Sequence, residues 1–124
     1  MPHIAAADAP VFRLPGTTFI GMAAPSRGSA ENAVWRVTLD PGTPARPHRL
    51  TREEVIVAAS GSAVASLDGM EILLNAGDTL VIPAFVDFSL ANTSELPFEA
   101  IAVLPVGARV VMNGQEPFVP PWSI

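Results

Sequence analysis

The sequence contains no cysteine, no lysine and no tyrosine, so all seven of its basic residues are arginine. These absences exclude disulfide bonds, thiolate and iron–sulfur chemistry, and Schiff-base catalysis through a lysine. Only two histidines are present, His3 near the N-terminus and His48 in the body of the chain. Any imidazole-dependent mechanism is therefore expected to run through His48.

Positive charge and long apolar runs are also scarce. The formal net charge is −5 and the isoelectric point is about 4.8, which leaves no basic patch for nucleic acid or an anionic membrane surface. Apolar stretches such as residues 55–59 fall far short of the roughly 20 residues of a membrane helix. Residues 1–10 lack the basic start and apolar centre of a signal peptide. We expect a soluble, cytoplasmic protein with no nucleic-acid or membrane partner.

What the chain does contain is apolar residues and turn formers. Of its 124 residues 49% are hydrophobic, and 13 Pro and 9 Gly are spread along the chain, which favours a single all-β domain (residues 1–124) over a helical bundle. The mean hydropathy of +0.39 is high for so small a domain. Self-association as a homodimer, or an apolar ligand cavity, would account for this excess, and composition does not separate the two.

Short strands separated by turns are expected along most of the chain. Trp35, Val37 and Leu39 alternate with polar residues, as in a half-buried strand, and Asp68-Gly69 predicts a type I′ hairpin turn. Residues 1–31 are interpreted as an N-terminal arm with one short strand, and residues 32–105 as the core. Residues 106–124 are expected to form a last strand and a Pro-rich strap. The expected strands are 17–22, 33–39, 55–59, 64–67, 70–74, 79–82, 87–91, 99–104 and 108–112.

Two spaced patterns lie within this strand series. The first is Gly42, His48, Leu50, Glu54 and Gly61, and the second is Gly77, Pro83, Phe85, Phe88 and Asn92. Together they resemble the two motifs of the cupin family over roughly residues 32–105. The resemblance implies a double-stranded β-helix, which is a small jelly-roll barrel.

The chain departs from the family pattern at the positions that usually hold a metal. Cupins usually carry His where Leu50 and Phe88 stand and Gly where Phe85 stands, so only His48 and Glu54 match the metal-binding pattern. The resemblance implies a divalent metal, because cupins commonly bind one. With only two donor residues, we expect such a metal to be weakly bound or absent. His48 and Glu54 would lie about 20 Å apart on a continuous strand, so a bend at Thr51-Arg52 is needed to bring them together.

Apolar residues at these positions predict an apolar pocket. Leu50, Phe85 and Phe88, joined by Trp35 and Ile56, would suit a small hydrophobic or aromatic molecule. Phe85 is expected nearer the mouth than Phe88, and filling of the barrel core is the alternative role of Phe88. The alternatives for the two ionisable residues are a structural imidazole at His48 and an ion pair of Glu54 with a nearby arginine.

Three functions remain open. The first is a metal-poor isomerase or cyclase in which His48 and Glu54 are the catalytic residues and move a proton on a carbonyl substrate. The second is a non-catalytic ligand-binding or sensing module in which His48 donates one hydrogen bond. The third is a metal-dependent cupin oxygenase or epimerase. The sequence does not decide between an enzyme and a binding protein, because one barrel supports many chemistries.

Overall fold

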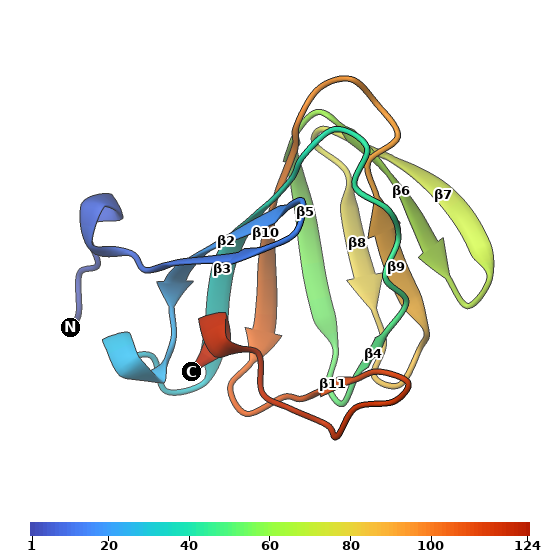
Figure 1. Ribbon diagram of the computed structural model, residues 1–124. Coiled ribbons are helices and arrows are strands. Elements are labelled where there is room, and N and C mark those ends of the chain that lie inside the picture. Colours follow the sequence, from blue (N-terminus) through green and yellow to red (C-terminus); the bar gives the residue numbers. More distant parts are fainter.

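Figure 1 shows the computed structural model, which describes all 124 residues. Its regular structure consists of strands and three short 3-10 helices, and no helix is long and apolar enough to cross a membrane. The strands are β1 (Val11–Leu14), β2 (Thr17–Ala23), β3 (Asn32–Leu39), β4 (Arg49–Leu50), β5 (Glu54–Ser60), β6 (Ser62–Leu67), β7 (Met70–Asn75), β8 (Thr79–Ile82), β9 (Phe88–Ala91), β10 (Phe98–Pro105) and β11 (Val110–Val111). The 3-10 helices are η1 (Ala6–Asp8), η2 (Pro25–Arg27) and η3 (Pro121–Ser123).

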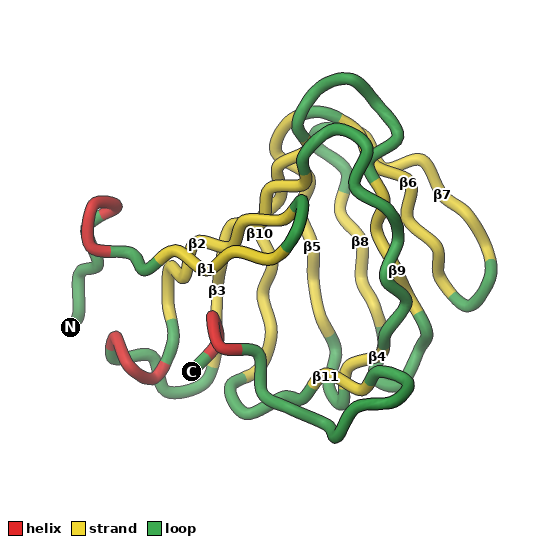
Figure 2. Tube along the Cα trace, in the orientation of Figure 1, coloured by secondary structure: helices red, strands yellow, loops and turns green.

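The strands form two facing layers. The larger is an antiparallel sheet of order β1-β2-β3-β10-β5-β8, and the other contains β7-β6-β9 together with the pair β11-β4. Single bridges from His48 to Phe88 and from Val110 to Phe118 extend this second layer. The layers face each other in Figures 1 and 2, but their hydrogen bonding does not close into a continuous barrel. The all-β jelly-roll expected from the sequence is confirmed in this open form.

Alternation along the strands explains which side chains form the core. In β3 the residues Ala33, Trp35, Val37 and Leu39 are buried, and every second residue of β10 is buried as well. Successive side chains of a strand point to opposite faces, so each of these strands contributes one apolar face to the interior. The alternation that predicted the strand 33–39 therefore also identified its core face.

Turn residues end the strands where the sequence indicated. Asp68 and Gly69 have φ of 49° and 84°, which is the pair of left-handed conformations that a type I′ hairpin between β6 and β7 requires. The side chain of Asn92 is fully buried after β9 and donates hydrogen bonds to the carbonyls of Leu39 (3.0 Å) and Leu96 (2.8 Å). This amide thus ties the loop after β9 to the end of β3.

The N-terminal segment is more than an arm with one strand. It forms a hairpin of β1 and β2, and β2 pairs with β3 from Thr17 to Ala23 with a bulge near Gly21. This hairpin adds two strands to the large sheet, whereas we expected an arm with a single short strand. The sequence missed β1 because Val11-Phe12-Arg13-Leu14 is a short edge strand with little burial.

The C-terminal segment runs back across the open end of the two layers (Figure 1). Phe118 exchanges backbone hydrogen bonds with Val110 at 2.7 and 3.1 Å, and η3 packs against the first three strands. The strap expected from its prolines is present, because a proline-rich segment cannot join a central ladder. Only its single bridge at Phe118 is strand-like.

Phe85 is the one residue of the second motif with a strained backbone. Its φ is +62°, and its side chain is 59% exposed in the turn between β8 and β9. A left-handed conformation costs a non-glycine residue roughly 1–2 kcal/mol. We predict that Phe85→Gly raises the free energy of unfolding by about 1 kcal/mol, measured by urea denaturation. Phe85→Ala is the control, because it removes the same exposed ring but keeps the Cβ, and it should give no such gain.

Candidate functional site

A cavity of about 180 Å³ lies between the two layers. Residues from both sheets and from the two terminal segments surround it, and 14 of the 21 lining residues are hydrophobic. Its volume is similar to that of engineered apolar cavities that accept a single aromatic ring. The lining residues are Leu14, Thr17, Phe19, Trp35, Val37, Leu39, Thr43, Pro44, Arg46, His48, Leu50, Glu54, Ile56, Phe88, Leu90, Ala102, Val110, Met112, Phe118, Pro120 and Trp122.

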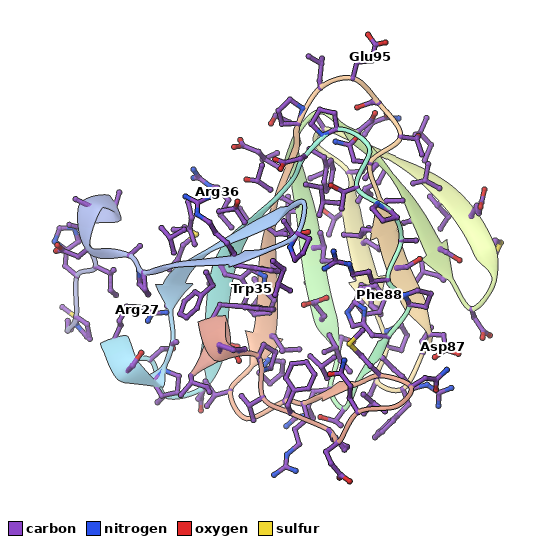
Figure 3. All side chains as sticks on the ribbon, viewed as in Figure 1. Arg27, Trp35, Arg36, Asp87, Phe88 and Glu95 are labelled. Carbon is purple, nitrogen blue, oxygen red and sulfur yellow. The ribbon has the colours of Figure 1, made fainter.

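Four of the five expected pocket residues lie on this wall. Trp35 and Phe88 project inward from facing layers (Figure 3), and Leu50 and Ile56 join them. Phe85 does not line the cavity, which corrects the expectation that it would form the mouth. The turn after Pro83 points the ring of Phe85 into solvent, and only its backbone N–H contacts this region, by donating to the Leu50 carbonyl at 2.8 Å.

A bend brings the two ionisable residues to one cavity. The chain bends at Thr51 and Arg52, as the spacing of His48 and Glu54 requires. Two hydrogen bonds hold this bend to the segment before β11: the Thr51 N–H donates to the Arg109 carbonyl (3.0 Å), and the Arg109 N–H donates to Thr51 Oγ1 (2.8 Å). The bend therefore belongs to the folded framework, and both His48 and Glu54 line the cavity.

His48 is half-buried and held in one orientation. Its Nδ1 lies 2.9 Å from the carbonyl oxygen of Arg46, and its ring packs on Phe88 with centroids 4.3 Å apart. A carbonyl only accepts hydrogen bonds, so Nδ1 carries the proton and Nε2 of the neutral ring keeps its lone pair. Burial lowers the pKa of His48 below its usual 6.5, against the smaller opposing effect of the Arg46 hydrogen bond. The imidazole is thus a neutral base at neutral pH.

Glu54 begins β5 and is only 5% exposed. Its carboxyl group makes no hydrogen bond with the protein, and the single ion pair of the molecule joins Arg49 to Asp87 instead. An ion pair of Glu54 with Arg46 or Arg52 is therefore not formed. Burial without a partner raises the pKa of Glu54 to about 8, so the carboxyl group is mostly protonated at neutral pH.

Several cavity residues come from segments that sequence reasoning did not assign to the site. Trp122 of η3 stacks on Phe19 of β2, with ring centroids 3.6 Å apart and planes at 4°. Its ring also meets Trp35 edge to face at 6.3 Å. The tail Pro117 to Trp122 did show aromatic residues among prolines. That composition indicates a packed segment, but it does not say which face the segment covers.

The residues on the wall do not fit a resident divalent metal. Zinc sites with catalytic roles normally take three protein ligands, and non-haem iron takes two histidines and a carboxylate. No group of three metal-ligating side chains exists in this structure, and Leu50 and Phe88 stand where the resemblance to cupins would place histidine. His48 and Glu54 are the only potential ligands of this kind on the cavity wall. No chemical step is therefore assigned to a metal.

Comparisons with known proteins agree with this architecture. The family model described as Cupin domain matches residues 35–104, and no curated protein matches the chain. The polyketide cyclase RemF from Streptomyces resistomycificus is similar in structure, with a TM-score of 0.78 and 18% identity over 94% of this chain and 87% of that protein.

Two further solved structures share the fold with lower TM-scores. KdgF from Halomonas sp. gives a TM-score of 0.68 and 19% identity, covering 82% of this chain and 89% of that protein. Salicylate 1,2-dioxygenase from Pseudoaminobacter salicylatoxidans gives 0.71 and 21% identity, and the match covers 86% of this chain but only 31% of the dioxygenase. These likenesses are evidence for the fold alone.

Proposed function

Because the chain belongs to the cupin family, we propose that its cavity binds a compact apolar carbonyl compound and that His48 and Glu54 transfer protons on it. One observation carries this proposal. The same apolar cavity lowers the pKa of His48 and raises that of Glu54 to about 8, so a neutral base and a neutral acid coexist near neutral pH. Groups whose pKa values are shifted in this way inside a cavity are candidates for acid–base catalysis.

The two groups can together convert a ketone into its enol. Nε2 of His48 takes the proton from the carbon next to the carbonyl, while the Glu54 carboxyl group donates its proton to the carbonyl oxygen. The products of this step are an enol, an imidazolium and a carboxylate. Return of a proton to a different carbon completes an isomerisation, and attack of the enol carbon on a second carbonyl closes a ring. The activity proposed is thus that of an isomerase or a cyclase.

The cyclase form of this proposal has a parallel in a protein of the same fold. RemF is a polyketide cyclase of similar size and fold. The alternative is a binding or sensing module without catalysis, which the predominantly apolar cavity also supports. A metal-dependent oxygenase or epimerase has less support, because the wall offers two potential metal ligands.

A thermal-shift screen tests the cavity as a binding site. Alicyclic and aromatic ketones, acids and alcohols should raise the melting temperature more than sugars or nucleotides, because a ligand that buries apolar area gains roughly 25 cal/mol per Å². Ligand at about 100 times its Kd stabilises by about 2.7 kcal/mol. Phe88→Leu should change the ranking of the hits, whereas His3→Gln, at the exposed N-terminus, should not. If sugars raise the melting temperature more than the apolar compounds do, the proposal is contradicted.

We further propose that the protein is a homodimer. The outer face of the large sheet carries five adjacent apolar side chains, of which Val57 and Val81 are exposed and Val55, Ile101 and Val103 are partly exposed. Of these, Val57 is 38% exposed and Val81 is 53% exposed. A second copy would remove this face from water, which the high mean hydropathy also favours.

Light scattering of variants checks the dimer. We expect twice the monomer mass for the unmodified protein and a monomer for Val57→Glu, because the glutamate would be buried without a partner at the interface. Leu73→Glu is the control, since Leu73 is 61% exposed on β7 of the other layer. A monomer at every practical concentration would show that the proposal is wrong.

A further inference from the structure

Arg46 is the only permanently charged residue on the cavity wall. Three lining residues are ionisable, namely Arg46, His48 and Glu54. Burial favours the neutral forms of His48 and Glu54, as described above. At neutral pH the lining residues therefore carry one net positive charge in an otherwise apolar cavity. This guanidinium is partly exposed, and it attracts an anion more strongly than a charge in bulk water does, because the effective dielectric constant near a protein surface is lower.

The guanidinium of Arg46 is held in place but lacks an acidic partner. Its Nη2 donates a hydrogen bond of 2.8 Å to the carbonyl of Pro15 in the turn between β1 and β2. No carboxylate lies within ion-pair distance, since the one ion pair of the protein involves Arg49. Nε and Nη1 have no protein acceptor. The half-buried side chain is thus fixed at the cavity with donors to spare.

The backbone of Arg46 connects this donor group to the base. Its carbonyl oxygen accepts the Nδ1 proton of His48 at 2.9 Å, so the residue that holds the imidazole also places a guanidinium on the same wall. A molecule that contacted both would have an anionic group at one end and its reactive carbonyl beside His48. The chain therefore provides separate positions for binding and for proton transfer.

From this arrangement we infer that Arg46 binds a carboxylate of the ligand, so that the cavity selects compact apolar monocarboxylates. The inference rests on the proposed function and narrows its substrate class to keto acids and related acids. The planar guanidinium can donate two parallel hydrogen bonds to a carboxylate, a geometry that lysine cannot reproduce. The Pro15 carbonyl takes one of the two Nη2 hydrogens, so the other can form a parallel donor pair with its neighbour on Nε or Nη1, and this pair with a single net charge matches one carboxylate.

Two probes of the same shape test the inference by calorimetry at neutral pH. These are 3-phenylpropanoate and 3-phenylpropan-1-ol, which share the apolar body and differ in the carboxylate. We expect the unmodified protein to bind the acid roughly 10- to 100-fold more tightly than the alcohol, as for a hydrogen-bonded charge pair. Arg46→Gln should abolish this preference and leave the affinity for the alcohol within about twofold. Arg46→Lys should retain only part of the preference for the acid.

Arg52→Gln is the control, because Arg52 is exposed and does not line the cavity. It should keep the full preference for the acid. Equal affinity of the unmodified protein for the two probes would overturn the role of Arg46 while leaving the cavity as a binding site. If Arg46→Gln loses affinity for both probes equally and its melting temperature is unchanged, Arg46 only shapes the cavity and does not bind the carboxylate. Binding of neither probe would overturn the proposed function and this inference with it.

Discussion

Glu54→Gln is expected to stabilise the protein by about 3 kcal/mol at pH 7, one of the largest gains that a single substitution can produce. The carboxyl group has a pKa of about 8 in the folded protein and 4.5 as its ordinary value. Below the ordinary value it is protonated in both states and contributes nothing to the pH dependence. As the pH rises from 4.5 to 8, the unfolded chain loses the proton and the folded protein keeps it, so the free energy of unfolding falls.

The loss of stability that Glu54 causes stops growing once its carboxyl group is ionised in both the folded and the unfolded state. Above the folded pKa it reaches about 5 kcal/mol, because a tenfold difference in proton affinity between the two states corresponds to about 1.4 kcal/mol. A glutamine cannot ionise, and its amide fills nearly the same volume as the protonated carboxyl group. The stability difference between Glu54→Gln and the unmodified protein should therefore grow with pH and be small near pH 4.5.

Urea denaturation between about pH 5 and pH 9 measures this difference. Glu53→Gln is a matched control, because Glu53 is the adjacent residue, carries the same group and is exposed. Its stability curve should follow that of the unmodified protein. If the stability curve of Glu54→Gln is also parallel to that of the unmodified protein over the whole pH range, then Glu54 titrates normally in the folded protein. It then cannot act as an acid near neutral pH.

His48→Gln is expected to lower proton transfer on a bound ketone by about 10²- to 10⁴-fold, the usual contribution of a positioned general base. A glutamine side chain could still donate to the Arg46 carbonyl, but it has no basic nitrogen. Exchange of the α-hydrogens of 1-indanone in D₂O, followed by NMR, reports this step without knowledge of the natural substrate. His3→Gln is the control, since it alters the other histidine, which is exposed and away from the cavity.

The pH dependence of this exchange gives a second readout. The rate should fall on the acid side when His48 becomes protonated, at a pH below its usual 6.5, and on the alkaline side when Glu54 ionises near 8. Glu54→Gln should remove the alkaline limb. If the His48→Gln variant still binds 1-indanone and exchanges its α-hydrogens at an unchanged rate, the role of His48 is refuted. A binding module is then favoured.

The sequence by itself determined the fold class and most of the strands. Alternation at Trp35, Val37 and Leu39, and the turn residues Asp68 and Gly69, act over a few neighbouring positions, so they can be recognised without tertiary contacts. The two spaced motifs, compared with a known family, also brought His48 and Glu54 into one hypothesis. Their convergence required a bend at Thr51, which the structure contains.

Only the tertiary structure decided what surrounds the two ionisable groups. The protonation states of His48 and Glu54 depend on burial and on missing partners, and both are set by segments remote in sequence. Trp122 reaches the cavity because η3 folds back onto β2, while Phe85 leaves it because a single positive φ turns its ring to solvent. Local sequence patterns encode strands and turns, whereas the wall of a cavity is a long-range property of packing.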